Sequence, residues 1–449
     1  MNDFLSHDLL ADILTRAKKF GADAADAILL QGISQSVSQR LGNTEAIERS
    51  EDCKLALRVF IGCQEAAVST TDFKKSVLNN MIERAIAMAK VAPKNSYAGL
   101  ADSAQIANKW PYIEMFDKTE LSVDNLIERA KSTEEAARAV HGITNSEGAQ
   151  AQFTVSEITM AATNGFAGAY KQSSYSLGVA VIAAGTDQKM ERDYDYSTKV
   201  FDEDLDKPAD VGRRAGERAV RRLNPRPVKT CLVPVVMEPR VSCSMLNYLA
   251  SAISGLAIAR GTSFLKNSMN KQLFSEEIRI MDEPHRPRGF RSKPFDAEGL
   301  ATSSRAMIDK GRLTSWILDL TTARQLGLNS TANAVRSSNG NIEPNVSNFY
   351  MTPGKVSPKQ LINEVRQGLF VTDLMGTSVN LITGDYSQAA IGYWIDNGEI
   401  TYPVSEITIG GHLEKMFTSI VPANDLTFQY GTDCPTILID GLVVAGKGR

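Results

Sequence analysis

The sequence predicts an α+β protein, with an N-terminal α/β region of helices and antiparallel sheets followed by a strand-rich C-terminal domain. In the first half, apolar residues recur at helical spacing in several segments, and strand-like runs lie between those segments. A basic stretch with two prolines, RRLNPRPVKT at 221–230, marks the best boundary. Beyond it few helices are indicated, and tight-turn pairs separate most of the strand-like runs.

The chain is long enough for more than one core. Its 449 residues exceed an ordinary single domain and favour two or three. We expect a helix, three strands and a helix in residues 1–110, a second and similar unit in 111–225, and a strand-rich domain in 226–449.

The first unit should open with a helix over residues 8–20 that Gly21 ends. The residues expected on its apolar face are Leu9, Leu10, Ile13, Leu14, Ala17 and Phe20. Three strands and a second helix are expected next, in DAILLQG, SQSVSQRLGN, KLALRVFIG and DFKKSVLNNMIERAIAMAKVAP.

The same order of elements recurs in the second unit. A helix, three strands and a closing helix are expected in VDNLIERAKSTEEAARAVHG, AQFTVSEITMAATNG, SYSLGVAVIAAG, KMERDYDYST and DVGRRAGERAVRRLNP. LALRVFIG (55–62) resembles LGVAVIAAG (177–185), and ERAIAMAKVAP (83–93) resembles ERAVRRLNPRP (217–227). An internal duplication and a chance likeness of two α+β segments explain these matches equally well.

The C-terminal domain should begin with a strand in CLVPVVMEP and a helix through the uncharged run 246–259. Two hairpins are expected where Lys310-Gly311 and Asn397-Gly398 supply the positive φ angles of tight turns. A helix in SPKQLINEVRQG should have Ser357 as its N-cap, and a last strand is expected in PTILIDGLVVAGKG.

Composition argues against several classes of protein. A net charge of −3 and a pI near 6.0 disfavour a nucleic-acid or anionic-membrane binder. No uncharged apolar run reaches the ~20 residues of a membrane span, and the N-terminus lacks the pattern of a signal peptide. Five scattered cysteines without a CxxC pair fit reduced thiols. We therefore expect a cytoplasmic protein with no membrane or direct nucleic-acid partner.

No local motif for catalysis is present. The four histidines, His7, His141, His285 and His412, are too far apart in sequence to share a helical metal site. There is no GxSxG elbow, no P-loop and no GxGxxG after a strand, and Cys434 has no basic neighbour that would activate its thiol.

Two polar, glycine-containing stretches remain as candidates for binding: ARGTSFL (259–265) and TDLMGTSVNLITGDYSQAAIG (372–392). Small residues at a strand end let another backbone approach, as an extended peptide at a sheet edge requires. The alternative is that both are only tight turns and bulges. The substrate-binding candidates are Arg260, Gly261, Thr262, Ser263, Gly376, Asp385 and Ser387.

Several of these segments resemble the TldD/PmbA family. The likeness is carried by RLGNTEAIERSEDCKLALRVFIG followed by STTDF, by ARGTSF, by ANDLTF and by the long block from FYMTPGK to GGHLEKMF. The part LMGTSVNLITGDYSQAAIGYWIDNGEITYPV is similar to the PmbA branch, also called TldE. The resemblance covers nearly the whole chain.

The resemblance implies a cytoplasmic peptidase assembly. In the family, a TldD-type subunit carries HExxxH on a helix just before an RGTS-like loop, and a later cysteine completes a zinc site. TldD-type and PmbA-type subunits form a heterodimer around a chamber for unfolded peptides, used in peptide maturation and protein degradation. An older family label is modulator of DNA gyrase.

The zinc motif does not carry over to this chain. Counting back from Arg260, the two histidine positions correspond to Leu246 and Ser251, and the glutamate position to Asn247. LNYLAS thus stands in place of HExxxH, and its side chains are poor zinc ligands. Cys434 lies next to the terminal strand and does not match the family cysteine. We therefore expect no catalytic or metal-binding residue in this chain, and zinc in a TldD-type partner.

Three hypotheses follow. The favoured one is a non-catalytic subunit that pairs with a TldD-like chain, or with itself, and helps to hold an unfolded peptide. The second is a self-contained peptidase with a non-metal site around Ser263 or Ser387. The third is a regulator of a DNA gyrase-related target, acting through protein contacts.

Overall fold

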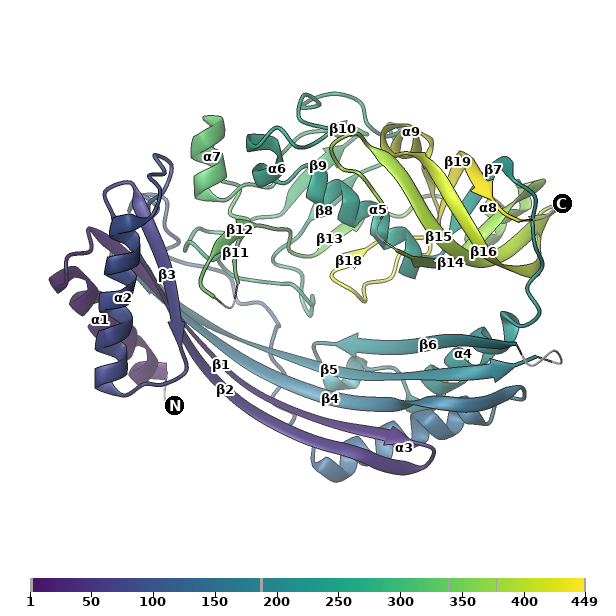
Figure 1. Ribbon diagram of the computed structural model, residues 1–449, viewed down its shortest axis with the longest axis horizontal. Coiled ribbons are helices and arrows are strands. Elements are labelled where there is room, and N and C mark those ends of the chain that lie inside the picture. The colour runs from purple at the N-terminus through teal and green to yellow at the C-terminus, as the bar shows by residue number, and fades with distance from the viewer. Residues whose placement is uncertain (1–2, 186–188, 338, 377, 448–449) are drawn as a thin grey trace.

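The computed structural model describes residues 3–185, 189–337, 339–376 and 378–447. Sequence predictions that include Met1, Asn2, Thr377 or Gly448 lie partly outside these ranges. The chain is a mixed α+β protein, as the sequence predicts. A long, curved antiparallel sheet forms one side of the molecule, and the strand-rich C-terminal region lies over one of its faces (Figure 1).

The N-terminal half forms one continuous sheet. Its strands have the order β3-β2-β1-β4-β5-β6, and every pairing is antiparallel. The order helix, three strands, helix occurs twice along the chain, and the two sets join where β1 pairs with β4. The elements are α1 (Asp3–Lys19), β1 (Ala24–Arg40), β2 (Asn43–Ile61), β3 (Gln64–Thr70), α2 (Lys75–Val91), α3 (Val123–Arg138), β4 (Ile143–Ala162), β5 (Ala167–Ala184), β6 (Met190–Lys199), the 3-10 helix η1 (Asp202–Asp204) and α4 (Pro208–Arg221).

Some boundaries differ from the sequence predictions. The two strands expected in DAILLQG and SQSVSQRLGN are one strand, β1, because its pairing with β4 runs without a break. β2 begins at Asn43, well before the predicted KLALRVFIG, and β3 was not predicted. Phe20 does not join the apolar face of α1, since it follows the helix and is 42% exposed.

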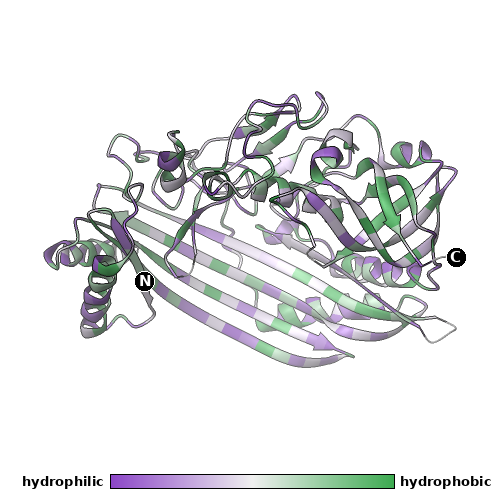
Figure 2. Cartoon of the chain, turned by 45° about the horizontal axis from the view of Figure 1, so that its top comes forward, coloured by the Kyte–Doolittle hydropathy of each residue, from purple (hydrophilic) through white to green (hydrophobic). Residues whose placement is uncertain are grey.

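All four long helices cover the same face of this sheet. α1 and α2 pack on the β1–β3 end around Leu29 and Leu57, and α3 and α4 pack on the β4–β6 end around Tyr175. Polar and apolar residues alternate along the strands (Figure 2), because successive side chains point to opposite faces. α3 and α4 approach closely because Gly212 has no side chain; a Cβ there would lie 2.1 Å from the carbonyl oxygen of Thr133.

The C-terminal half is built mainly from short elements and two larger sheets. One sheet has the order β16-β15-β14-β7-β19-β17, and a further β16–β19 pairing closes it on itself; the other has the order β10-β9-β8-β13-β18, and β11 pairs with β12. The elements are β7 (Cys231–Met237), α5 (Pro239–Ala252), α6 (Gly255–Ala259), β8 (Ile280–Asp282), β9 (Arg305–Asp309), β10 (Arg312–Leu313), α7 (Leu320–Leu326), β11 (Ala334–Arg336), β12 (Ile342–Pro344), β13 (Phe349–Met351), α8 (Pro358–Asn363), β14 (Gln367–Met375), β15 (Asp385–Asp396), β16 (Glu399–His412), α9 (Leu413–Ser419), β17 (Val421–Pro422), β18 (Thr432–Asp433) and β19 (Ile437–Ala445).

The predicted turns and cap of this half are confirmed. Lys310 and Asn397 have φ angles of 45° and 48° and lie in the β9–β10 and β15–β16 hairpins. Ser357 caps α8 and accepts a hydrogen bond from the backbone of Gln360. The predicted helix 357–368 is shorter than expected, because its last residues, Gln367 and Gly368, already belong to β14.

The uncharged run 246–259 is not one helix. α5 ends at Ala252 and α6 begins at Gly255, because the strand-like backbone of Ile317 inserts at the break. The amide of Ile317 donates to the carbonyl of Ile253 (3.1 Å), and the amide of Gly255 donates to the carbonyl of Ile317 (2.7 Å). Apolar composition predicted the helix but gave no signal for this tertiary contact.

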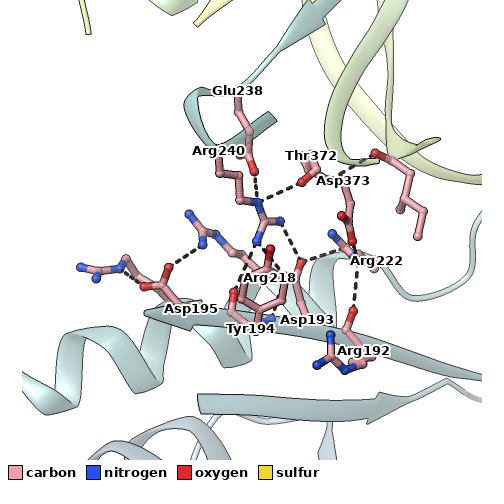
Figure 3. Close-up of polar contacts among 12 residues, drawn as sticks. Arg192, Asp193, Tyr194, Asp195, Arg218, Arg222, Glu238, Arg240, Thr372 and Asp373 are labelled. Carbon is pink, nitrogen blue, oxygen red and sulfur yellow. Dashed lines mark hydrogen bonds and ion pairs between the residues drawn. The ribbon is translucent and has the colours of Figure 1, made fainter. Parts of the chain in front are cut away.

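A buried ionic cluster joins the two halves (Figure 3). Asp193 on β6 is 1% exposed and pairs with Arg222, just after α4 (2.7 Å), and with Arg240 in the first turn of α5 (3.0 Å). Arg240 also pairs with Glu238 and donates to the carbonyl of Thr372 (2.9 Å). Burial lowers the pKa of Arg240, but the carboxylates of Glu238 and Asp193 outweigh this and raise the pKa above its ordinary value.

A second buried pair ties the other end of the sheet to the C-terminal half. Asp26 on β1 contacts Arg58 on β2 (2.6 Å) and Arg336 on β11 (2.5 Å). The two guanidiniums hold the pKa of Asp26 below its ordinary value although burial acts in the opposite direction. Close by, Phe295 packs edge-on against Phe166 of the N-terminal half, with ring centroids 5.0 Å apart.

Replacing Asp193 should weaken the contact between the halves. Asp193→Asn keeps the side-chain shape but removes the negative charge that pairs with the buried Arg222 and Arg240. Breaking a buried pair in this way costs about 3–5 kcal/mol, so we expect a clearly lower denaturation midpoint. Glu51→Gln, which removes only an exposed pair with Arg49, is the control and should leave the midpoint unchanged. Equal midpoints for the two variants would contradict this account.

Candidate functional site

A pocket of about 370 Å³ opens where α5, α6 and β12 meet. α5 contributes Asn247 and Ser251, and the segment that ends α6 contributes Arg260 and Thr262. Arg291 and Glu343 belong to other parts of the C-terminal half and also line the pocket. The pocket therefore combines two of the three positions that the resemblance aligns with HExxxH with part of the RGTS loop.

The three positions of that motif are divided between the core and the pocket. Leu246 is 1% exposed and belongs to the main C-terminal core, whereas Asn247 and Ser251 are exposed at the pocket. An alkyl side chain has no donor atom for a metal, and a carboxamide and a neutral hydroxyl are poor replacements for imidazole. Within the residues that the structure describes, no three His, Cys, Asp or Glu side chains gather as a metal site would need. These residues do not fit a zinc ion.

The loop after α6 is fixed by its own backbone. Gly261 has a φ of +68°, and its amide donates to the carbonyl of Ile258 (3.0 Å). The amide of Thr262 donates to the carbonyl of Ala257 (3.0 Å), which completes a Schellman motif. This turn ends the helix and leaves Arg260, Gly261 and Thr262 exposed.

Ser263 has a structural role in the same loop. It is 2% exposed, and its hydroxyl donates to the carbonyl of Ala252 (2.6 Å) and accepts from the amide of Leu265 (3.0 Å). The side chain thus anchors the loop to the end of α5. Of the four RGTS residues, only Arg260 and Thr262 line the pocket.

The second glycine-containing stretch lies against the first. The amide of Phe264 donates to the carbonyl of Leu381 (2.9 Å). Gly376, Asp385 and Ser387 are exposed around the β14–β15 connection, and none of them lines the pocket. The hydroxyl of Thr383 donates to Asp385 (2.6 Å). The structure therefore brings the two predicted stretches together, but it divides their candidate residues between two surfaces.

α5 also contacts the Gly376 segment through Gln388. The Tyr248 hydroxyl is 3.1 Å from the side-chain amide of Gln388, which accepts from it when the amide nitrogen points toward the carbonyl of Gly376 (2.7 Å). The rings of Tyr248 and Tyr386 pack edge-on with centroids 6.1 Å apart. These contacts fix the second stretch relative to the helix that carries Asn247 and Ser251.

The sequence did not identify the far wall of the pocket. Arg291 follows a basic, proline-containing segment, and Glu343 lies on a short strand far along the chain. Neither belongs to a motif with recognisable spacing. Glu343 reaches the pocket because β12 lies beside α6, and Arg291 is held there by contacts with Asn348 and Thr432.

His412, His285 and Cys434 each have a structural environment. His412 is the last residue of β16 and immediately precedes α9, and its ring lies 2.9 Å from the carbonyl of Thr383. Burial lowers the pKa of His285, whose ring contacts the Thr302 hydroxyl (2.9 Å). Cys434 is 2% exposed, and burial raises the pKa of its thiol well above the ordinary value.

Cys434 should therefore resist alkylation in the native protein. A thiol that is buried and neutral is a poor nucleophile, whereas Cys63 is exposed. We expect iodoacetamide at pH 8 to modify Cys63 and to spare Cys434, as measured by mass spectrometry of tryptic peptides. Both should be modified in denaturant. Rapid native labelling of Cys434 would show that it is a reactive thiol after all.

Comparison with known proteins gives matches along most of the chain. Three family models match: PmbA/TldA metallopeptidase domain 1 at residues 25–89, the central domain at 116–223 and the C-terminal domain at 230–446. The Metalloprotease PmbA homolog of Haemophilus influenzae is 35% identical over 96% of this chain and 94% of its own length. Metalloprotease PmbA of Escherichia coli O157:H7 is 34% identical over 95% and 93%.

Solved structures share the fold. A protein of Bacteroides thetaiotaomicron described as a putative modulator of DNA gyrase has a TM-score of 0.90 and 27% identity, over 98% of each chain. TldE of Thermococcus kodakarensis has a TM-score of 0.88 at 20% identity, over 98% of this chain and 100% of its own, which establishes likeness of fold alone.

Proposed function

Because the chain belongs to the PmbA/TldD (PmbA/TldA) metallopeptidase family, we propose that it is a non-catalytic subunit of a zinc metallopeptidase assembly that cleaves or matures unfolded peptides. Its relatives are named metalloproteases, so its scaffold is that of a peptidase. The observation that carries the proposal is the set of side chains at the three motif positions. Leu246, Asn247 and Ser251 do not provide the ligands and general base that water activation at zinc requires.

The large sheet supports a role in holding peptides. Its inner face, defined here as the face away from α1–α4, looks toward the C-terminal half (Figure 1). Uncharged polar residues lie opposite one another on that face in β1, β4 and β5: Ser36, Ser38, Gln150, Gln152, Thr154, Ser174 and Ser176. A second pocket, of about 480 Å³, opens over this surface. Short hydroxyl and amide side chains can hydrogen-bond an extended backbone whatever its side chains are, which suits unfolded substrates.

The proposal assigns the chemistry to a partner. A TldD-like subunit would carry the zinc ion, and this chain would complete the chamber as its heterodimer partner or, alternatively, would pair with itself.

The cytoplasm is the proposed place of action. Within the residues that the structure describes, every helix is too short or too polar to cross a bilayer.

Co-expression with a TldD-like protein of the same host tests this function. We expect the two chains to co-elute, with about one zinc ion per pair bound by the partner, and cleavage of an unfolded peptide only when the partner is present. Metal content would be measured by elemental analysis of the complex and of each chain alone. If the isolated chain bound stoichiometric zinc and cleaved the same peptide, the proposal would be wrong.

The serines of this chain should not be needed for cleavage. Ser387→Ala should leave cleavage by the co-expressed pair unchanged, since the chemistry is assigned to the partner's metal. Ser263→Ala should instead lower the thermal midpoint, because the hydroxyl bridges Ala252 and Leu265. Chelator-resistant cleavage by this chain alone that Ser387→Ala abolished would indicate a serine-dependent peptidase.

A further inference from the structure

The pocket beside α5 has a surplus of positive charge in an acidic protein. Two arginines, Arg260 and Arg291, line it together with one acidic residue, Glu343. The whole chain, by contrast, has a net charge of −3. Arginine suits the binding of a carboxylate, because its planar guanidinium can donate two parallel hydrogen bonds.

Arg260 is available for such a contact. It is exposed, and its side chain makes no hydrogen bond or ion pair with any residue in the described ranges. Its backbone, in contrast, is fixed, because the amide donates to the carbonyl of Leu256 (3.2 Å) and the Schellman motif follows directly. The backbone of Arg260 is therefore fixed while its guanidinium has no partner among the described residues. Its positive charge is available to a ligand in the pocket.

Arg291 is held more firmly. Its Nη1 donates to the hydroxyl of Thr432 (3.1 Å), and its backbone amide donates to the side chain of Asn348 (2.9 Å). Its aliphatic stem lies over Gly431, where a Cβ would come within 2.8 Å of it. No carboxylate of the described residues forms an ion pair with Arg291, so its charge is oriented but not neutralised.

Neutral groups complete the surface. Asn247 and Ser251 on α5 and Asn345 after β12 can donate hydrogen bonds to a bound oxygen. A volume of about 370 Å³ is at the small end of the range for ligand sites and suits the last residue or two of a peptide. The carboxylate of Glu343 can accept a hydrogen bond from a backbone amide of the bound peptide. Its negative charge also disfavours the binding of a second anion.

We propose that this pocket binds a carboxylate of the peptide substrate through Arg260 and Arg291. The site thus occupies the surface where an active family member would hold its metal, and it gives the non-catalytic chain a specific contact with its ligand. The inference rests on the proposed function, since that function supplies the peptide. The carboxylate has two possible sources, the C-terminus of the peptide and an aspartate or glutamate side chain.

Three forms of one unstructured, fluorescein-labelled peptide of glycine, serine and alanine separate these sources. One has a free C-terminus, one a C-terminal amide, and one a C-terminal amide with a single internal glutamate. Fluorescence anisotropy with the full chain, and with the co-expressed pair, measures each affinity. We expect at least one carboxylate form to bind about tenfold more tightly than the neutral amide, and the form that does so identifies the source.

Variants connect the effect to the pocket. Arg260→Gln and Arg291→Gln should each remove most of the preference for a carboxylate while leaving the weaker binding of the neutral amide intact. Glu343→Gln should enlarge the preference, because it removes the opposing charge. Arg312→Gln, at an exposed arginine on β10, is the matched control and should change nothing. Circular dichroism would establish that every variant is folded.

Two results would overturn the inference, and they differ in scope. Equal affinities for the three peptides, or a preference that survives both arginine substitutions, would exclude the carboxylate site and leave the proposed function intact. Failure of every peptide to bind, both to this chain and to the co-expressed pair, would overturn the proposed function as well.

Discussion

The contact between Asp193 and its two arginines is the constraint on which the rest of the structure depends. Arg222 follows the last helix of the N-terminal half, and Arg240 begins the helix that carries Asn247 and Ser251. One buried carboxylate therefore fixes the direction of α5 relative to the edge of the large sheet. Since three charges share a buried site, any displacement of one half would leave an unpaired charge in a low-dielectric environment. The pocket and the inner face of the sheet are thus held at a defined separation.

Under the proposed function, the pocket serves for binding and the catalytic step belongs to a partner. Leu246, at the position that the resemblance gives to a first histidine, lies in the C-terminal core, where its side chain adds to the apolar area that α5 buries. The other two positions stay at the surface as Asn247 and Ser251, small polar groups that hydrogen-bond without ionising. The RGTS turn ends α6 through its own backbone hydrogen bonds, whatever side chains the helix carries.

The elements most readily predicted from sequence were those with local causes. The Lys310-Gly311 and Asn397-Gly398 turns, the Ser357 cap and the amphipathic helices depend on neighbouring residues only. The helix break at Ile253 was missed because it depends on Ile317, and the full length of β1 was missed because β4 pairs along all of it. At the pocket, sequence reasoning pointed to Asn247, Ser251 and the Arg260 loop, yet Arg291 and Glu343 could not be found. Glu343 comes to the pocket only because β12 lies beside α6, and Arg291 only through its contacts with Asn348 and Thr432.

The closed sheet of the C-terminal half has a consequence for how the protein is made. β7, at residues Cys231–Met237, pairs on one side with β14 and on the other with β19, the last strand along the described chain. While the ribosome is still translating the intervening residues, the second edge of β7 has no partner, although all six strands of the N-terminal sheet have already been synthesised. The first half can thus fold early and the second must wait. During that interval the apolar β7 edge is open to aggregation, a hazard that follows from topology and not from the stability of the finished fold.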